Sequence, residues 1–460
     1  MVSFRAMVQD TSCSPEIYLS SGNDLQCGGW GLEDDYSQPN SEQPDYTKLK
    51  ERTLLWAVNI PGESRWCSEN RLDFPAMADE TGSVAILPVQ LVYPNAHKFP
   101  LPGLEHIAVQ LKVYDRSAES LRPTDLYTFV GILTAEPVHS DFTSGVLVPT
   151  LHILFHRRLP KTIISSPLFS RITDIHTARD TFIAWLSREA LGGDRDAAEW
   201  VLLSCIASVK SRNPPILPPS ITLSNFTRPS TSKVPTLSYI LSEVLPLYLF
   251  LPLTLNYLNE ERFEPESRDE DLNSGVLQVP IGTTILATET EVQEGKLIDK
   301  GLRNIQALQD VAKLQTLRYN FPFSQYSFPT DIKFITVTDG GKSLFFEANI
   351  NVPIHSDASS DLYKIKQIIE WPSPETLAAF RGIIIQARTG KVVVDDALSQ
   401  HIKTNFVQER QVNKSITSDD LIRQMSISRL VALSRQESQM SMESWILAKE
   451  LDVRRISRNS

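Results

Sequence analysis

The stretch from Ile216 to Leu245 has the order of elements that surrounds the phosphates of a bound nucleotide in many ATPases. Residues 221–223 form a short β-prone run, residues 229–234 are expected to be a loop, and residues 237–245 repeat apolar side chains at helical spacing. Strand, loop and helix follow one another in this way in a P-loop, whose backbone N–H groups bind phosphate. The chemistry that this order suggests is phosphate binding and phosphoryl transfer.

The residues that this chemistry requires are missing from the loop. A P-loop needs glycines so that its backbone can curl round the phosphate, followed by a lysine and a hydroxyl residue for Mg²⁺. The segment from Asn225 to Pro235 contains no glycine, although it contains Lys233. Pro229 and Pro235 also remove N–H donors from the backbone that would bind phosphate. We therefore interpret this stretch as the scaffold of an ATPase that has lost the residues needed to bind and hydrolyse ATP. We predict neither catalytic nor cofactor-binding residues.

The end of a P-loop motif occurs elsewhere, in Gly340-Gly341-Lys342-Ser343. Five residues before Gly341 stands Thr336, which belongs to a β-prone run, so a phosphate-binding loop cannot close there. We predict a turn after a strand instead.

Two histidines lie close enough in the sequence to be considered as ligands of one metal ion. His152 and His156 are four residues apart in a β-prone run, where that spacing separates them by about 13 Å, too far for one metal ion. We predict core or surface histidines and no metal ligands. No G-x-S-x-G, H-E-x-x-H or G-x-G-x-x-G occurs, so hydrolase, zinc-protease and dinucleotide-binding interpretations have no supporting motif.

The composition is that of an ordinary soluble protein. The 460 residues include 41% hydrophobic and 22% charged residues, which suits about two to four domains. The net charge of −10 gives no general attraction to nucleic acid. The four cysteines form no C-x-x-C pair, so we expect neither a disulfide framework nor a zinc ribbon but a reducing compartment. The most apolar run, residues 244–255, is too short to span a bilayer, and no signal peptide is visible.

Residues 1–160 are expected to form an OB-like β-domain with loop inserts at 20–50 and 68–97. The inserts are weakly patterned, and the first is rich in Gly, Ser, Asp, Gln and Pro. Short strands separated by turn signals favour a small β-barrel of this kind. The expected strands are residues 2–10, 54–60, 108–114, 126–134 and 147–155.

Residues 161–371 are expected to form an α/β domain. Two helices, 177–190 and 194–209, are separated by Gly192-Gly193 and precede the strand, loop and helix described above. The charged segment 256–273 is most simply a solvated insert. The expected elements that follow are β-prone runs at 276–279, 283–287 and 332–337 and a helix at 305–314.

Residues 372–460 are expected to form a C-terminal bundle of four helices that folds as a separate unit, followed by a tail. Ser373 is an N-cap with Pro374 at the first helical position and Gly390 past the end. The other helices have cap candidates in Asp395 or Asp396, in Thr417 to Asp420, which resembles a capping box, and in Ser441, after which Trp445, Ala448 and Leu451 point inward. Arg454-Arg455-Ile456-Ser457 has the form of a kinase site, but a frayed basic terminus explains it more simply. A helical bundle after an α/β unit is the layout of an AAA+ module and its lid.

Five segments spread along the chain resemble the minichromosome maintenance (MCM) complex-binding protein family. This family usually begins with a helical segment, which is absent here, and carries a long insert, which is short here. The segment Pro61-Gly62-Glu63-Ser64-Arg65-Trp66 is either a partner-docking turn or a structural turn. The segments that carry the resemblance are residues 4–10, 61–66, 99–103 before Val113-Tyr114-Asp115, 191–199 and 275–280.

The family is itself similar to the MCM helicase subunits, which implies a degenerate AAA+-like domain. At the Walker B position, Thr284 to Glu289 keeps the apolar strand and the glutamate but has Thr288 where an aspartate would help to hold Mg²⁺. No arginine occurs between Lys342 and Arg381, where an arginine finger would be expected. The zinc-binding cysteines of those subunits have no counterpart. Together these losses argue against phosphoryl transfer.

The sequence therefore predicts an α+β multidomain protein that is not an enzyme and has no cofactor. The resemblance implies that it binds MCM helicase subunits in the nucleus and acts in DNA replication and in sister-chromatid cohesion, in assembling, protecting or unloading the helicase, with no direct nucleic-acid or membrane partner. One alternative is an OB-fold single-stranded DNA-binding protein, for which Tyr114, Tyr127 and Phe129 would be the stacking residues. The other is a weak AAA+ ATPase.

Overall fold

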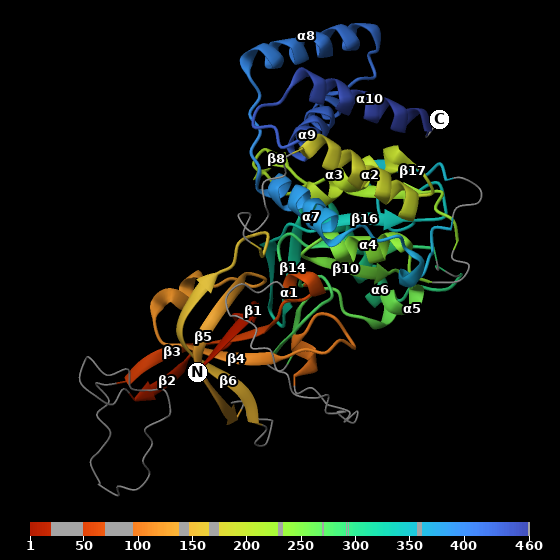
Figure 1. The fold of residues 1–460 in the computed structure, drawn as a ribbon. Helices are drawn as coiled ribbons and strands as arrows, with labels where there is room; N and C mark the ends of the chain where they lie inside the picture. The colour runs from red at the N-terminus through yellow and green to blue at the C-terminus, as the bar shows by residue number, and fades with distance from the viewer. Residues whose placement is uncertain are drawn as a thin grey trace, which may run out of the picture.

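A computed structural model describes residues 1–19, 49–69, 95–137, 147–164, 174–228, 233–268, 271–290, 292, 294–356 and 361–458. A ring of strands from the N-terminal part lies beside an α/β part, and the C-terminal helices stack on the α/β part (Figure 1). The expected inserts at 20–50 and 68–97 fall outside the described residues except at their ends. Within the described ranges, no helix is long and apolar enough to cross a membrane.

The N-terminal strands pair into a closed ring. β1 (Val2–Asp10) pairs with β5 (Leu126–Pro137) and with β3 (Leu49–Asn59), while β4 (Ala108–Val113) and β6 (Leu147–Arg158) complete the circle. Neighbours run antiparallel except β4 and β6, which are parallel. Each strand lies where the sequence predicts one. β2 (Glu16–Leu19) pairs antiparallel with the first residues of β3. The other short elements around the ring are α1 (Arg65–Glu69), η2 (Ala96–Lys98) and η3 (Arg116–Ser120).

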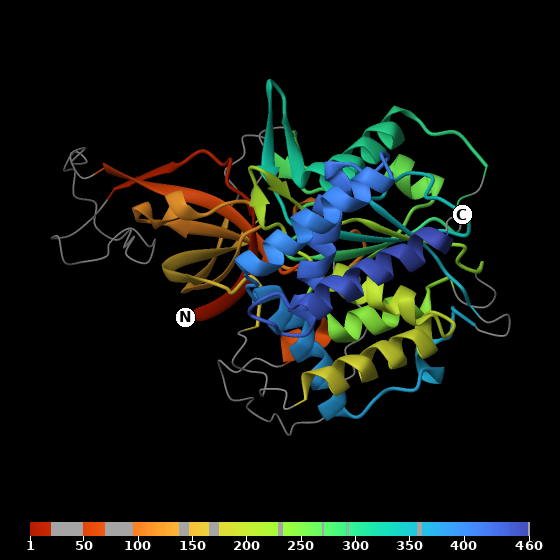
Figure 2. The ribbon, with the colours of Figure 1, turned by 90° about the horizontal axis from the view of Figure 1, so that it is seen from above.

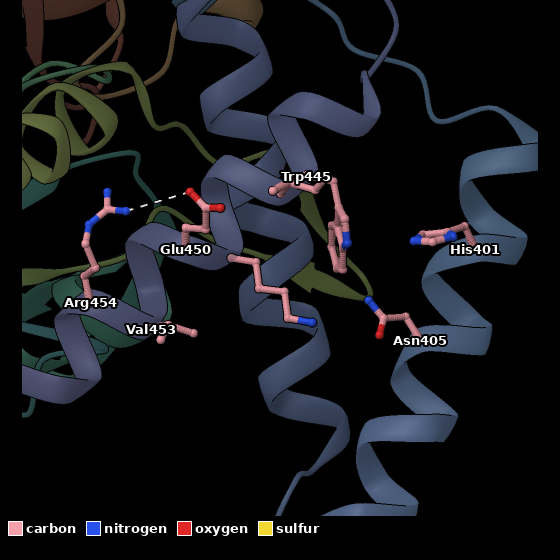
Figure 3. A pocket seen from close by; sticks show the side chains of 8 residues that line it. His401, Asn405, Trp445, Glu450, Val453 and Arg454 are labelled. Carbon is pink, nitrogen blue, oxygen red and sulfur yellow. Dashed lines mark ion pairs between the residues drawn. The ribbon is translucent and has the colours of Figure 1, made fainter.

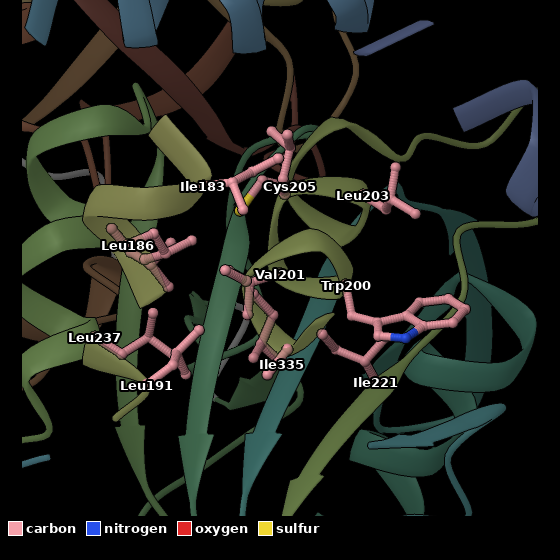
Figure 4. Packing of buried hydrophobic residues seen from close by; sticks show 14 of the residues in the cluster. Ile183, Leu186, Leu191, Trp200, Val201, Leu203, Cys205, Ile221, Leu237 and Ile335 are labelled. Carbon is pink, nitrogen blue, oxygen red and sulfur yellow. The ribbon is translucent and has the colours of Figure 1, made fainter. Parts of the chain in front are cut away.

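The α/β part is built on a five-stranded parallel sheet. In spatial order its strands are β10 (Tyr248–Pro252), β13 (Thr284–Thr288), β16 (Lys333–Val337), β9 (Ile221–Ser224) and β17 (Ile350–Pro353). Neighbouring side chains of a strand point to opposite faces, and the central strands β13 and β16 supply apolar residues to both, as in a sheet that is covered on both sides. Leu286 and Ile335 pack beneath α2 (Ile175–Ala190), α3 (Arg195–Ile206) and α4 (Thr236–Val244) (Figure 4). Ile285 and Phe334 pack on the other face, against α6 (Asp299–Leu314). The smallest elements of this part are β7 (Ser211–Arg212), β8 (Pro215–Ile216) and η5 (Lys366–Ile368).

The charged segment 256–273 is not a solvated insert, so that prediction was wrong. It continues α5 (Leu255–Glu260) and forms β11 (Glu266–Arg268) and β12 (Asp271–Asn273), which join β14 (Thr316–Phe321) and β15 (Ser324–Pro329) in a second sheet. Its charges have partners in remote segments: Glu264 accepts a hydrogen bond from Arg318 at 2.9 Å, and Asp271 forms an ion pair with Lys98. Phe263, just before Glu264, is buried.

The apolar run Val276–Val279 is also not a strand. Its backbone turns back instead, because the N–H of Val276 donates to Arg262 O at 2.8 Å and that of Leu277 to Phe263 O at 3.0 Å. Gly275 permits this approach, since a Cβ at that position would lie 2.4 Å from Phe263 O. The apolar side chains of the run are buried because the turn lies inside the molecule.

The four C-terminal helices have the ends that the sequence predicts. They are α7 (Pro374–Thr389), α8 (Asp396–Val412), α9 (Ser418–Ser434) and α10 (Met442–Arg458). Ser373 and Asp395 accept hydrogen bonds from the backbone N–H three residues later, and Thr417 and Asp420 form a reciprocal capping box. Ser441 likewise accepts from Ser444 N at 3.1 Å.

Three of these helices share part of their core with the α/β part, while Leu398, Ile402, Ala432, Met440 and Trp445 form a smaller cluster within the C-terminal region. Phe380 and Ile384 of α7, Leu430 of α9 and Leu451 of α10 belong to one apolar cluster with α2, α3, α4 and the sheet. Only α8 stands apart, because Leu398 and Ile402 are its only buried residues. Figures 1 and 2 show α8 on the outside of the molecule. The apolar residues of α7, and part of those of α9 and α10, therefore complete a core that is shared with the α/β part.

The basic end of α10 is docked rather than frayed. Arg454 and Arg458 form ion pairs with Asp196 at 3.1 and 2.9 Å, and Arg458 also reaches Asp194 at 2.7 Å. Both aspartates belong to the first turn or cap of α3. Arg454 of the kinase-like motif, together with Arg458, therefore fixes α10 to the amino end of α3, whereas Arg455 pairs with Asp452 of its own helix.

The segment 61–66 joins the ring to the α/β part, which supports the structural interpretation of this turn. Gly62 has φ of +71° and its carbonyl accepts a hydrogen bond from Tyr248 N at 2.9 Å. Ser64 N donates to Pro246 O at 3.0 Å, and Trp66 lies under the guanidinium of Arg381, 4.3 Å from the ring centre. The turn is therefore an internal contact between two parts of one chain.

Candidate functional site

The carboxyl edge of the parallel sheet is where the P-loop-like stretch lies, between the ends of β9 and β16. Ligands of open α/β sheets commonly bind at such an edge. Here the N–H of Asn225 donates to Gly340 O at 3.0 Å and the N–H of Phe226 to Thr338 O at 2.9 Å. The two loops thus bond to each other, and the first N–H groups after β9 are not available to phosphate.

Side chains of the protein fill the space in front of α4. Phe226 and Tyr363 are both buried, and their rings meet edge to face at 5.8 Å. The N–H of Thr236, at the start of α4, donates to Leu362 O at 2.9 Å. Residues 361–363 therefore occupy the amino end of the helix to which a nucleotide phosphate would bind. Residues 229–232 of the expected loop lie outside the described ranges.

Glu289, at the Walker B position, is a structural hydrogen-bond acceptor. Its buried carboxylate accepts from Leu344 N at 2.8 Å, Phe345 N at 3.3 Å and the hydroxyl of Ser343. Burial raises the pKa of this carboxyl, and these hydrogen bonds oppose the shift. Gly340 to Ser343 therefore belongs to a turn after β16, as predicted, and Ser343 anchors that turn on Glu289. Thr288 beside it offers no carboxylate to a metal ion.

We expect no ATP hydrolysis, and no Mg²⁺-dependent ATP binding at this edge of the sheet. The backbone N–H groups there already donate to other segments of the chain, and side chains fill the space in front of α4. Titration with a fluorescent ATP analogue, with and without Mg²⁺, measures binding, and phosphate release measures turnover. Lys233→Ala should be indistinguishable from the wild-type chain. A micromolar dissociation constant that this substitution abolishes would contradict the prediction.

Two of the three aromatic residues considered for stacking on single-stranded DNA are buried. Tyr127 and Phe129 lie in the core of the ring, so they cannot stack on bases. The cation of Lys112 is buried between Glu16 and Glu136, at 2.9 and 2.6 Å.

The two histidines of the ring have separate surroundings. His152 lies 2.5 Å from a carboxylate oxygen of Glu136 and 2.6 Å from the hydroxyl of Tyr114, while His156 lies 2.9 Å from the hydroxyl of Ser117. The pKa of His156 is lowered by burial. No group of three or more potential metal ligands occurs among the described residues.

A groove between α8 and α10 is lined in part by exposed apolar side chains. It has a volume of about 400 Å³, with Trp445 at its base and Ile446 and Val453 along α10. Figure 3 shows His401 and Asn405 of α8 facing Trp445 across the groove. Ile446 and Val453, seven residues apart on α10, are 47% and 58% exposed.

The edges of the α8–α10 groove carry both positively and negatively charged side chains. Lys449 of α10 forms an ion pair with Glu409 of α8, and Glu450 lies 3.9 Å from Arg454. An apolar base with a charged margin is the composition of a protein-binding surface. The sequence analysis missed it, although Ile446 and Val453, seven residues apart, form a second apolar line on α10 beside the inward line of Trp445, Ala448 and Leu451.

Comparison with known proteins gives a consistent family. Residues 73–459 match the family described as mini-chromosome maintenance replisome factor. Mini-chromosome maintenance complex-binding protein from Arabidopsis thaliana is 26% identical over 98% of this chain and 86% of its own length. The proteins of the same description from Danio rerio and Homo sapiens are each 24% identical, over 100% and 92% of this chain and 88% and 71% of their own lengths. Because the family match covers most of its length, this chain belongs to the mini-chromosome maintenance replisome factor family.

Proposed function

We propose that this chain is a non-catalytic binding partner of the MCM helicase complex. The similarity to proteins described as mini-chromosome maintenance complex-binding proteins supports this partner. Replacement of the nucleotide position by Phe226, Leu362 and Tyr363 supports a role without phosphoryl transfer. With this partner, the chain would act in the nucleus during DNA replication, in assembly, protection or unloading of the helicase, with consequences for sister-chromatid cohesion.

We infer that the two sheets are an OB-like barrel and a degenerate AAA+-like domain. The first inference is supported by five strands that close on themselves through β1. The second is supported by the parallel sheet, by the strand, loop and helix at β9 and α4, and by the helices that follow. Such domains are shapes that MCM subunits use to contact one another, so the same kind of surface would serve a binding partner.

The proposal of a binding role rests mainly on the α8–α10 groove. Partners of a protein complex are held mainly by a few apolar side chains that become fully buried, surrounded by polar residues. Ile446 and Val453 satisfy this description, and α8 has few internal contacts to lose when it adjusts to a partner. We therefore place the contact with an MCM subunit at this groove.

Ile446→Asp and Val453→Asp, made together, are expected to weaken MCM association by about tenfold or more, because they place charges in a buried apolar contact. The measurement is co-precipitation of MCM subunits from nuclear extract, followed by affinity measurement with the purified complex. Leu302→Asp is the matched control, since Leu302 is 55% exposed on α6, away from the groove. Both variants should keep the wild-type thermal unfolding midpoint.

Full association by the groove variant would exclude this surface. Loss of association by the Leu302 control would show that added charge alone explains the effect. Submicromolar binding of single-stranded DNA at about 150 mM salt, where the Debye length is about 8 Å, would favour the DNA-binding alternative instead.

A further inference from the structure

A second cavity lies at the amino edge of the parallel sheet, opposite the edge where β9 meets α4. It has a volume of about 640 Å³. Its walls come from all three regions of the chain: the segment after β6, the segment after α3 together with the starts of β13 and β16, and the end of α7. The lining segments are residues 160–162, 208–210, 281–282, 331–333 and 388–389.

The lining of this amino-edge cavity is strongly basic, although the chain as a whole has a net charge of −10. Four cations, Lys161, Lys210, Lys333 and Arg388, share it with a single carboxylate, Asp331. Burial lowers the pKa of Lys210, and the nearby charges of Arg429, Lys161 and Lys391 act in the same direction. Among the described residues, no carboxylate forms an ion pair with any of the four lining cations.

Arg388 and Lys333 differ in how many of their donors are used. Arg388 donates to Cys205 O at 2.8 Å, Gly282 O at 3.3 Å and the hydroxyl of Thr284 at 3.2 Å, so it is a fixed charge. Lys333 is 2% exposed and donates at 3.1 Å to Gly282 O, one hydrogen bond for the three N–H groups of an ammonium. Burial and the charge of Arg388 lower the pKa of Lys333 to about 8. A buried ammonium with so few partners is costly unless an anion joins it.

We propose that this cavity binds a small anion that carries phosphate groups, held by Lys161, Lys210 and Lys333, with Arg388 as a fixed positive charge. The volume of the cavity is of the size used for small molecules, which favours a small anion over an acidic peptide. Lysine is a common phosphate ligand because its compact charge suits a phosphate oxygen. The amino-edge position distinguishes this site from the lost nucleotide site.

The test is calorimetric titration of the full chain with inorganic tripolyphosphate at about 150 mM salt, together with thermal unfolding at the same concentrations. The wild-type chain should bind saturably, and its unfolding midpoint should rise because the ligand binds only the folded state. Lys333→Met should weaken binding by about tenfold or more. The same variant without ligand should be at least as stable as the wild-type chain, since it removes an unpaired buried charge.

Lys342→Met is the matched control, because Lys342 is exposed at the opposite edge of the sheet. It should bind tripolyphosphate like the wild-type chain. The proposal is overturned if tripolyphosphate does not bind, or if both methionine variants bind it equally well. Binding of a polyglutamate peptide or of single-stranded DNA in the absence of tripolyphosphate binding would also overturn it. None of these results depends on MCM association, which we place at the α8–α10 groove.

Discussion

Lys98→Met is expected to lower the free energy of unfolding by about 3–5 kcal/mol, because it leaves a buried carboxylate without its counter-charge. Lys98 is fully buried, and its ammonium lies 3.0 Å from Asp10, which is also buried, and against Asp271. It also donates to Leu272 O at 3.2 Å. Asp10 belongs to the ring and Asp271 to the α/β part, so one cation joins the two.

Urea unfolding followed by tryptophan fluorescence measures this effect, since Trp56 lies 5.2 Å from the Lys98 ammonium. Lys313→Met is the control, because Lys313 pairs with Glu347 on the surface and such pairs contribute at most about 1 kcal/mol. Adding Asp10→Asn to Lys98→Met should recover part of the loss, because the unpaired charge disappears. Equal effects of the two lysine substitutions would contradict the prediction.

The same cluster has a defined dependence on acid. Burial alone would raise the pKa of Asp271, but the hydrogen bond from His97 and the charge of Lys98 lower it to about 2. A carboxyl whose pKa is lower in the folded state stabilises the protein above its unfolded pKa, about 4, and that contribution is lost as the pH falls toward 2. The acid sensitivity of the wild-type chain in this range should therefore be reduced in Lys98→Met.

Local chemistry in the sequence was sufficient to predict many element ends. Ser373, Asp395 and Thr417 were identified as caps because a cap needs only its own side chain and the next few N–H groups. The strands of the ring were also predictable, since their short β-prone runs are separated by turn signals. The packing of the C-terminal helices on the α/β part was not predictable, because an apolar helix face does not show which partner it meets.

Contacts between remote segments explain what the sequence did not reveal. The charged segment 256–273 appeared solvated because the partner of Asp271, Lys98, is 173 residues away in the chain. The loss of the phosphate loop was visible in its missing glycines, but its replacement by Leu362 and Tyr363 required the fold. The amino-edge cavity likewise draws its cations from four separate segments, and none of these segments has a motif.

Deleting residues 373–460 should have the largest effect of all, by unfolding the α/β part. The deletion removes Phe380, Ile384, Leu430 and Leu451 from the apolar cluster that covers one face of the sheet. Each such side chain contributes about 1.5–3 kcal/mol on burial, and the total stability of a domain is only about 5–15 kcal/mol. Residues 1–372 should therefore lack a cooperative unfolding transition and be cut rapidly by protease within α2 to α4.

Two point variants test, in the intact chain, how much the shared core contributes to stability. Phe380→Ala should lower the free energy of unfolding by about 3–5 kcal/mol because it leaves a cavity in the shared core. Val412→Ala, at the end of α8, should change it by less than about 0.5 kcal/mol because Val412 is 90% exposed. If residues 1–372 unfold cooperatively at the wild-type midpoint, the C-terminal helices are a separate unit after all. If they do not, loss of MCM association by such a truncation says nothing about the interface, and only surface substitutions such as Val453→Asp can locate it.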